Sequence, residues 1–498
     1  MNFAGVDIGT THCKGVVLSV TGNVLFEEKH SYDFKETSNE HFEQDPDIIF
    51  QTVLEVFQKL IRFCSQTNMP ACFCFSGAMH SLIAIDEAGK PITHAFTWTD
   101  SRSKKYAAEL LQQEAENEIY KHTGTPIHPM SPLCKIIWLR YEMPELFRNT
   151  HKFISIKEYI FSRLFGKYVV DYSIASATGL FDIYNGAWYD KALHVAGITR
   201  HQLSTPVPPV FSDLKLKDEY KNLADSGASF TVITGGSDGC LANLGCGAIA
   251  PHEAALTIGT SGAIRMVTTR PEPDIRQRLF NYILSDKLYI TGGPINNGGI
   301  VLKWFAENIL ERSFQTANDF EWFSSLAQHA QAGSNGLIFL PYIAGERAPI
   351  WDADARGIFF GLTSAHAREH LMRSIMEGIC FSLHHVMSAV EERQGTIETI
   401  YATGGFIQSS FWLQLLTDIL NKKIIVTSEH DASAVGAALF GIYATGNITD
   451  LKKIKEFIPA GRVLTPDSAT NAFYQSHISI FRSLYPKLKE EFRMINRQ

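Results

Sequence analysis

The stretch VDIGTTHCK at residues 6–14 and the stretch LTIGTSGA at residues 256–263 decide the fold of this chain. Each is typical of a strand end, a tight turn rich in glycine and hydroxyl groups, and the start of a second strand. Glycine lets the backbone approach an anion closely, and the amides and hydroxyls of such a turn can then bind phosphate oxygens. One turn opens each half of the chain. The pair predicts a duplicated fold whose halves grip one polyphosphate from both sides.

The composition is that of an ordinary globular protein. The 498 residues are 45% hydrophobic and 19% charged, with a net charge of -7 and no block of Lys or Arg. We therefore expect binding neither to nucleic acid nor to an anionic membrane. Asp7 and Gly9 interrupt the first apolar run, which predicts no signal peptide, and no apolar run reaches the length of a membrane span. Eight cysteines without a C-x-x-C pair predict reduced thiols in a cytoplasmic protein.

Strands alternate with helices along the chain, which is typical of an α/β fold. Asp45 before Pro46 is predicted to cap a helix, because apolar residues follow at helical spacing. In the first half, strands are predicted at 71–75, 81–85 and 231–234, and a helix from about 240. In the second half, strands are predicted at 337–341 and 400–403, and helices at 299–310, 369–390, 411–420 and from 452 onward. The boundary between the halves is expected between 247 and 253.

Two aspartates stand beside these turns and strand ends, and each has two interpretations. Asp7 directly precedes the first turn, where a carboxylate would repel phosphate unless a cation lay between them. It therefore predicts a Mg²⁺ site reached through water, or else it caps the turn. Asp238 lies in GGSDGC (235–240), at a strand end and a helix start. It can accept a proton from a hydroxyl that attacks phosphorus, or cap the helix.

Polar and aromatic residues cluster in FSGAMHS (75–81) and WTDSR (98–102). A polyol site needs fixed donors and acceptors together with an aromatic wall. That mix is supplied by His80, Trp98, Asp100 and Arg102. Taken singly, each of them is also typical of a structural role, such as a buried histidine or a surface ion pair.

Glycines and arginines recur in two later segments. The loop over 345–362 is rich in Gly, Arg and aromatic residues, and we predict that most of it is structural. Gly404 and Gly405 precede a helix, where a flat ring or a phosphate can approach the backbone.

A rival metal signal lies in HAREH (366–370), which matches the H-x-x-E-H zinc pattern. The other interpretation of these residues is the polar first turn of an amphipathic helix.

In their order along nearly the whole chain, these segments resemble the motifs of the FGGY carbohydrate kinases. The matching segments are DIGTT (7–11) with Lys14, Met79-His80, WTDSR (98–102), GSDG (236–239), IGTSG (258–262), ARG (355–357) with FGL (360–362), and Gly404-Gly405 followed by Trp412 and Gln414. The resemblance implies a duplicated ribonuclease-H-like fold of the actin/Hsp70/sugar kinase type. Its two domains, 1–247 and 248–498, would surround a cleft, with the sugar mainly on the first and ATP mainly on the second.

The resemblance also implies roles for particular residues. Asp238 would be the catalytic base and contact the substrate, and Asp7 and Asp238 would lie near Mg²⁺. Phosphate and nucleotide contacts are implied at Gly9, Thr10, Thr11, Lys14, Gly259, Thr260, Gly404 and Gly405. Contacts to a small sugar acid or polyol are implied at Met79, His80, Trp98 and Arg102.

Within the family, the segments at 76–81, 124–132, 294–300 and 345–349 resemble the branch that acts on gluconate. His80 stands where xylulose kinases also have His and glycerol kinases have an Arg-Glu pair, which argues against glycerol. The resemblance thus implies ATP-dependent phosphorylation of D-gluconate to 6-phospho-D-gluconate, with D-xylulose as the alternative, and a homodimer. The carboxylate of gluconate needs a cationic or N–H-rich partner. Candidates in the sequence are Arg102, Lys135 and Lys157.

An ATP-driven binding module of the actin/Hsp70 type would share the fold and is a more distant alternative. It would not need the two polar-aromatic clusters, and its ATPase activity would be indifferent to sugar.

Overall fold

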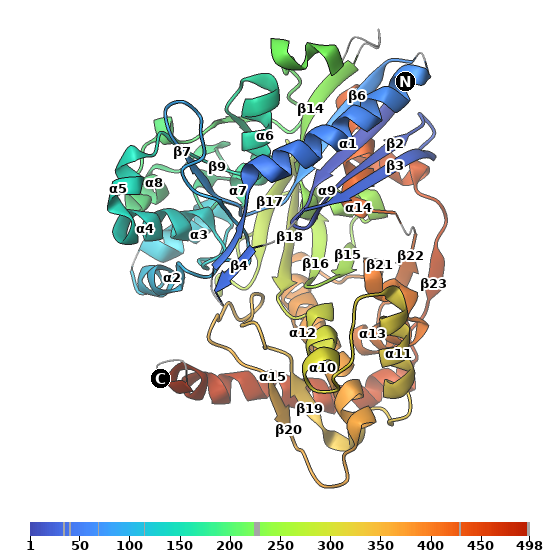
Figure 1. The fold of residues 1–498 in the computed structure, drawn as a ribbon. Coiled ribbons are helices and arrows are strands. Elements are labelled where there is room, and N and C mark those ends of the chain that lie inside the picture. The colour runs from blue at the N-terminus through green and yellow to red at the C-terminus, as the bar shows by residue number, and fades with distance from the viewer. Residues whose placement is uncertain are drawn as a thin grey trace.

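Two large β-sheets form the centres of the two halves of the protein (Figure 1). The computed structural model describes residues 1–32, 35–38, 41–67, 69–113, 115–223, 230–427 and 430–495. The first sheet contains β1 (Asn2–Ile8), β2 (His12–Leu18), β3 (Val24–Ser31), β6 (Ala71–Gly77) and β14 (Phe230–Ser237). The second contains β15 (Glu253–Ile258), β16 (Gly262–Thr268), β17 (Phe280–Ser285), β18 (Leu288–Ile295), β21 (Thr399–Thr403), β22 (Lys423–Val426) and β23 (Arg462–Leu464).

The two sheets share one strand order. In the first sheet the order is β3-β2-β1-β6-β14, and the matching part of the second is β18-β16-β15-β21-β22. In both, the first three strands are antiparallel and the remaining two run parallel to the third. Each glycine turn joins corresponding strands, β1 to β2 and β15 to β16. This correspondence confirms the predicted duplicated fold.

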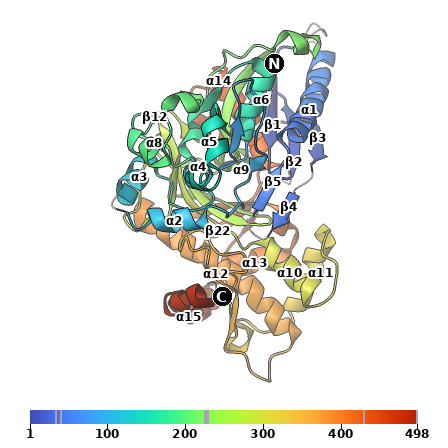
Figure 2. The same ribbon diagram turned by 60° about the vertical axis from the view of Figure 1, so that its left-hand side comes forward.

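Helices and short strands complete the two halves. The helices are α1 (Pro46–Gln66), α2 (Lys104–Leu110), α3 (Ala115–Thr123), α4 (Pro132–Glu142), α5 (Pro144–Asn149), α6 (Ile156–Phe165), α7 (Tyr172–Ser176), α8 (Asp190–Ala196), α9 (Asp238–Cys246), α10 (Gly299–Asn308), α11 (Ala317–Ala327), α12 (Arg368–Gln394), α13 (Ser410–Leu420), α14 (Ala432–Ala444) and α15 (Ser468–Ile495). The short strands are β4 (Lys35–Ser38), β5 (His41–Gln44), β7 (Ile83–Ile85), β8 (Ala95–Phe96), β9 (Lys152–Ile154), β10 (Val169–Asp171), β11 (Phe181–Asp182), β12 (Ala187–Trp188), β13 (Thr205–Val207), β19 (Ile338–Leu340) and β20 (Ile358–Phe360). In both views, α15 lies in the lower part of the molecule and projects to the left, and in Figure 1 β19 and β20 lie below it (Figure 1, Figure 2).

Helices α9 and α14 pack against each other between the two sheets. Helix α14 lies on β1 and β6 of the first sheet, although it comes late in the chain, and α1 covers the other side of that sheet. Glycines make the close approach possible. A Cβ atom on Gly436 of α14 would lie 1.9 Å from the carbonyl oxygen of Leu241 in α9, and one on Gly245 would lie 1.9 Å from that of Ala432.

The division into 1–247 and 248–498 stays a prediction.

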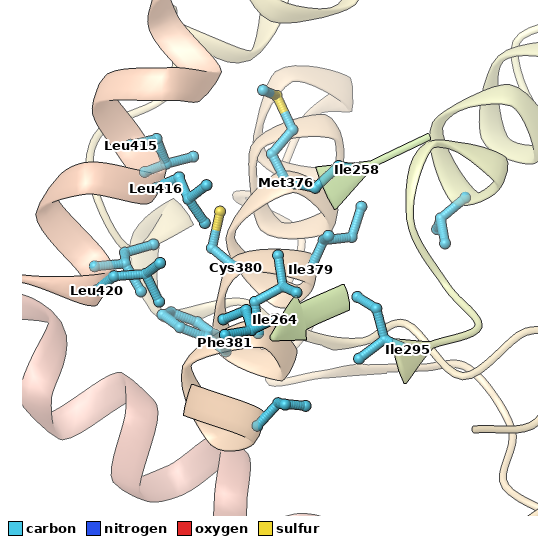
Figure 3. Close-up of a cluster of buried hydrophobic side chains, with 14 of the residues drawn as sticks. Ile258, Ile264, Ile295, Met376, Ile379, Cys380, Phe381, Leu415, Leu416 and Leu420 are labelled. Carbon is cyan, nitrogen blue, oxygen red and sulfur yellow. The ribbon is translucent and has the colours of Figure 1, made fainter. Parts of the chain in front are cut away.

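The core of the second half forms between its sheet and helices α12 and α13. Figure 3 shows Ile258 and Ile264 of the sheet facing Met376, Ile379 and Phe381 of α12. All five residues are at most 1% exposed. This core holds the end of β15 and the start of β16, the two strands that the second glycine turn joins.

Most predicted elements of the first half are confirmed. Asp45 caps α1 by accepting hydrogen bonds from the amides of Asp47 and Ile48, with Pro46 at the first helical position. Cys72 and Cys74 lie two residues apart on β6, so both side chains are on the same face of the sheet, in one buried cluster. The strand predicted at 81–85 is shorter and forms β7, which pairs with β9 outside the large sheet.

In the second half, the predictions for α10, α12, α13 and β21 are confirmed to within a few residues. The strand predicted at 337–341 forms β19, but it pairs only with β20 among the described residues. The prediction of a helical tail from 452 is confirmed only in part. A 3₁₀ helix at Leu451–Phe457 is followed by β23, which joins the edge of the sheet through β22, and only then by α15. Residues 496–498 of that predicted tail lie outside the described residues.

Candidate active site

The two glycine turns leave matching sets of backbone amides for a ligand. Gly9 and Gly259 each donate an amide hydrogen bond across their own turn, at 3.1 and 2.9 Å. Within the described residues, no protein group accepts a bond from the amides of Thr10 and Thr11 or, in the second turn, of Thr260. Free amides next to hydroxyls are what a phosphate oxygen requires. Both predicted phosphate turns therefore have suitable geometry.

Protein groups hold both turns in place. Trp98 Nε1 donates to Thr10 Oγ1 at 3.0 Å, which ties the second polar-aromatic cluster to the first turn. In the second turn, the amide of Gly299 at the start of α10 donates to the carbonyl of Gly259 at 2.8 Å. Gly404 has a φ of 106°, and a Cβ there would lie 2.3 Å from the carbonyl oxygen of Ile258. Only glycine fits this position, so the backbone of 404–405 packs directly beside the second turn.

Three carboxylates gather behind the first turn, around a single lysine. Lys14 forms an ion pair with Asp431, and Asp7 accepts a hydrogen bond from the Ser76 hydroxyl at 2.6 Å. Burial raises the pKa of Asp7 to about 8, and the negative charges of Asp431 and Asp238 act in the same direction. Asp7 thus meets Ser76 rather than capping the turn. A cation near these carboxylates would lower their pKa values again, and oxygen ligands suit Mg²⁺.

The contacts of Mg²⁺ in such a site would pass through water. Among the described residues, no three His, Cys, Asp or Glu side chains come close enough together to coordinate an ion directly. Mg²⁺ typically keeps several of its waters in phosphate sites.

Asp238 is the first residue of α9, and Ser237 takes the N-cap position. The helix-cap interpretation of Asp238 is therefore wrong. Its Oδ1 accepts a hydrogen bond from the Gly239 amide at 2.7 Å. Burial raises the pKa of the Asp238 carboxyl, and the nearby Arg265 opposes that shift. A carboxylate with a raised pKa is a stronger base, so its surroundings suit proton transfer.

A cavity of about 790 Å³ connects the two halves beside Asp238. Its lining includes Lys14, Asp238, Gly239, Thr257, Arg265, Thr403, Gly404, Gly405 and Asp431. Pockets of roughly 300–1,000 Å³ are typical of small-molecule and cofactor sites. The cavity brings together predicted residues from three distant parts of the chain and is large enough for a nucleotide.

Met79 lies beside the start of α9, and His80 follows it in the chain. His80 Nδ1 donates to the carbonyl of Ala177 at 2.8 Å, which leaves Nε2 to face the Tyr282 hydroxyl at 3.5 Å. Burial holds the pKa of His80 well below its ordinary value, so the ring is neutral. A Cβ on Gly239 would lie 2.8 Å from Met79 Cε, so Met79 packs directly beside the residue that follows Asp238.

Arg102 is occupied by protein carboxylates. Its Nε donates to Asp100 at 2.9 Å, and its Nη2 donates to Asp100 at 2.7 Å and to Glu43 at 2.6 Å. Its guanidinium also stacks on Phe96, 4.1 Å from the ring centre. These are the contacts of a positioning residue, and its predicted contact to substrate stays a prediction.

Lys135 and Lys157 also have protein partners. Lys135 is fully buried and donates to two backbone carbonyls, one of them that of His80 at 2.7 Å. Burial lowers the pKa of Lys135 to about 7. Lys157 pairs with Asp171 at 2.8 Å and donates to the carbonyl of Gly236 at 2.9 Å. Both lysines brace the backbone next to predicted site residues.

Three charged residues at the site were not predicted from the sequence. Asp431 caps α14, and an Asp before a glycine- and alanine-rich helix was a signal of that cap. Arg265 lies on a strand that is buried throughout, which is unusual for a charged residue. Arg347 belongs to the loop predicted to be structural, yet its guanidinium lies 4.4 Å from the centre of the Trp98 ring.

The zinc interpretation of residues 366–370 fails on geometry. The amide of Thr363 donates to His366 Nδ1, and the amide of Ala367 donates to His370 Nδ1. The two Nε2 atoms contact the backbone and the side chain of Asn335. All four ring nitrogens are therefore engaged with protein.

None of the described helices is both long enough and apolar enough to cross a bilayer.

Comparisons with known proteins agree with this geometry. Residues 3–245 match the N-terminal domain of the FGGY family of carbohydrate kinases, and residues 254–445 match its C-terminal domain. The chain is 40% identical over 499 residues to a gluconokinase of Bacillus subtilis (strain 168), covering 99% of this chain and 97% of that protein. It superposes on a gluconate kinase from Lactobacillus acidophilus with a TM-score of 0.91 at 35% identity, and on a ligand-bound xylulose kinase from the same organism with a TM-score of 0.91 at 34% identity. Each of these two alignments covers 99% of both chains. The chain therefore belongs to the FGGY family of carbohydrate kinases.

Proposed function

We propose that this carbohydrate kinase transfers the terminal phosphoryl group of ATP to the terminal hydroxyl of D-gluconate, giving 6-phospho-D-gluconate. The observation that carries the proposal is the 40% identity to a gluconokinase over nearly the whole of both chains. The cavity between the halves and the free amides of both glycine turns support the use of a nucleotide.

Asp238 is the proposed general base. Its Oδ1 is fixed by the Gly239 amide, so its Oδ2 can orient the substrate hydroxyl and accept its proton during attack on phosphorus. Met79 packs beside Gly239, the residue after Asp238, and His80 follows Met79 in the chain, so both would line the sugar pocket. The neutral His80 would offer hydrogen bonds to hydroxyls without adding charge.

The phosphate groups would be held by the two turns. The amides of Thr10, Thr11 and Thr260 would bind phosphate oxygens, and Lys14 and Arg265 would balance their charge from opposite halves of the cavity. Mg²⁺ held near Asp7 and Asp238 would neutralise charge on the transferring group. Closure of the halves would exclude water, which otherwise competes as the nucleophile.

A kinase for D-xylulose is the second candidate. The observation that favours it is the 34% identity and TM-score of 0.91 to a ligand-bound xylulose kinase. Fold and phosphate chemistry would be unchanged, and only the sugar contacts would differ.

The test is a coupled ADP-release assay with Mg-ATP and one of D-gluconate, D-xylulose, L-ribulose, glycerol or no sugar. We expect kcat/KM for D-gluconate to exceed that for every other acceptor by at least about 100-fold, because a buried charged group discriminates strongly between ligands. Preference for D-xylulose would replace the first candidate by the second. ATP hydrolysis that is indifferent to sugar would contradict both and favour an ATP-driven binding module.

Replacing Asp431 with asparagine separates its two roles. Asparagine caps a helix as well as aspartate does, so the bonds to the amides of Ser433 and Ala434, at 3.1 and 3.0 Å, should persist. The charge that holds Lys14 is lost, so we expect kcat/KM for ATP to fall about 10- to 100-fold. Thermal unfolding should shift by less than about 3 °C. Unchanged kinetics would mean that Asp431 serves only as the cap of α14.

We infer a cytoplasmic location from the cysteines, because all eight are buried and unpaired. A homodimer stays an expectation of the family resemblance.

A further inference from the structure

Arg347 is a buried cation with unused hydrogen-bonding capacity. The residue is only 6% exposed, and its Nε has no acceptor at all. Its Nη2 donates to the carbonyl of Ile295 at 3.1 Å. Among the residues that the structure describes, no carboxylate forms an ion pair with this guanidinium. Leaving a buried charge without such a partner is costly, so the site favours an anion that comes from outside the chain.

The neighbouring glutamate does not supply that partner. The carboxylate of Glu346 accepts hydrogen bonds from the amide of Asn296, the side chain of Asn297 and the backbone amide of Arg347 itself. Its oxygens are thus turned to neutral N–H groups. Burial lowers the pKa of Arg347 to about 10, as expected where the countercharge is incomplete.

Arg347 lies next to residues that are predicted to contact the sugar. Its guanidinium lies over Trp98, which bonds the first phosphate turn. Its positive charge acts on the buried rings of His80 and His128, and the charge of Asp238 acts on it in turn. The second half of the chain therefore places a cation among the predicted sugar contacts of the first half. This cation is close enough to interact electrostatically with Asp238, the proposed base.

The three cations predicted as carboxylate partners are all engaged. Arg102 holds Asp100 and Glu43, Lys157 holds Asp171, and Lys135 holds two backbone carbonyls. A guanidinium binds a carboxylate through two adjacent N–H groups, and the Nε edge of Arg347 has one N–H with no acceptor.

We propose that Arg347 binds the carboxylate of the sugar acid and so selects acids over neutral sugars. This proposal rests on the proposed function, since it requires an acidic substrate. The second half would then contribute to sugar recognition as well as to nucleotide binding. Because the cation and Trp98 come from opposite halves and already lie 4.4 Å apart, the substrate would contact both halves of the chain.

The test compares D-gluconate with D-gluconamide, in which a neutral amide replaces the carboxylate. KM is measured for both compounds. If the amide is not turned over, its inhibition constant against gluconate is measured instead. Wild-type enzyme should prefer gluconate by about 10- to 100-fold, the range of a charge-assisted paired hydrogen bond. In Arg347→Met this preference should fall to within about twofold, chiefly through a higher KM for gluconate, because only the acid loses a charged partner. KM for ATP should stay within about twofold.

Arg102→Met is the matched control, since it also removes a buried, ring-stacked guanidinium. It should leave the ratio between gluconate and gluconamide unchanged, whatever it does to turnover or stability. A purely structural role for Arg347 would weaken both ligands equally in Arg347→Met and keep their ratio, which would overturn the proposal. Should Arg347→Met fail to fold, Arg347→Lys decides by the same ratio, which should be intermediate.

The two proposals can fail separately. Wild-type enzyme without turnover of gluconate would contradict the proposed function. Wild-type turnover of gluconate with the acid preference intact in Arg347→Met would contradict only the role of Arg347.

Discussion

Asp238→Asn is expected to lower kcat by about 10²- to 10⁴-fold, the usual contribution of a general base. The asparagine carbonyl can accept the same bond from the Gly239 amide that Asp238 Oδ1 accepts at 2.7 Å, so the start of α9 should keep its shape. What is lost is the ability to take the proton of the attacking hydroxyl. The effect should therefore fall on kcat rather than on nucleotide binding.

Stability separates this loss from misfolding. Burial raises the pKa of Asp238, so its folded-state pKa lies above the unfolded value and burying the ionised form costs stability at neutral pH. The neutral asparagine avoids that cost, so the melting temperature at pH 7 should be equal to or higher than that of the wild type. Steady-state kinetics, titration with a nucleotide and a thermal melt check these expectations. Near-normal turnover in this variant would remove Asp238 from the role of base.

Gly436→Ala is expected to destabilise the protein by about 3 kcal/mol or more, at the upper end of overpacking effects. Its Cβ would lie 1.9 Å from the carbonyl oxygen and 2.7 Å from the carbonyl carbon of Leu241. Both atoms belong to the backbone of α9, so the clash can be relieved only by moving one helix away from the other. Loss of this size lowers a melting temperature by roughly 6–12 °C in a domain of a few hundred residues.

Turnover should fall in the same variant, because the two helices start at functional residues. Helix α9 begins at Asp238, and α14 is capped by Asp431. The matched control is Gly441→Ala in the same helix, where the nearest atom to the new Cβ is Cys72 Sγ at 3.3 Å. Alanine gains up to about 1 kcal/mol of helix propensity over glycine, so the control should stay within about 1 kcal/mol of wild type. Equal melting temperatures for the two variants would show that the close contact between α9 and α14 does not determine the stability of the protein.

Local patterns predicted the elements that depend on nearby residues alone. The helix cap of α1 followed from Asp45 and Pro46, because the cap is satisfied within one turn. The prediction missed strand β3, whose side chains alternate between exposed and half-buried at the sheet edge, so its sequence carries little apolar signal. It missed β23 because a strand of three residues is specified by its partner β22 rather than by its own sequence.

The candidate site was predicted in part. As with the fold, the residues marked by their immediate neighbours were found, and the contacts with distant partners were missed. Asp7, Asp238 and the glycine turns stand at strand ends, where the sequence alone marks an exposed carboxylate or an open backbone. Arg102 was chosen as a polar residue near an aromatic one. The alternative interpretation, an ion pair, holds for Arg102 and Asp100, but the sequence did not indicate Glu43 as a second partner, because it lies 59 residues away in the chain.

By itself, the sequence determined the duplication, the family and the positions of both phosphate turns, since glycine, hydroxyl residues and flanking apolar strands act over a few residues. The tertiary structure decided which charges meet. It brings Asp431 to Lys14 across 417 residues of chain and sets Arg347 over Trp98 from the opposite half. Such pairs depend on how helices and sheets pack, and that packing is fixed by buried surfaces and close glycine contacts far apart in sequence. A charged residue shows its chemistry in the sequence, but its partner is chosen only by the fold.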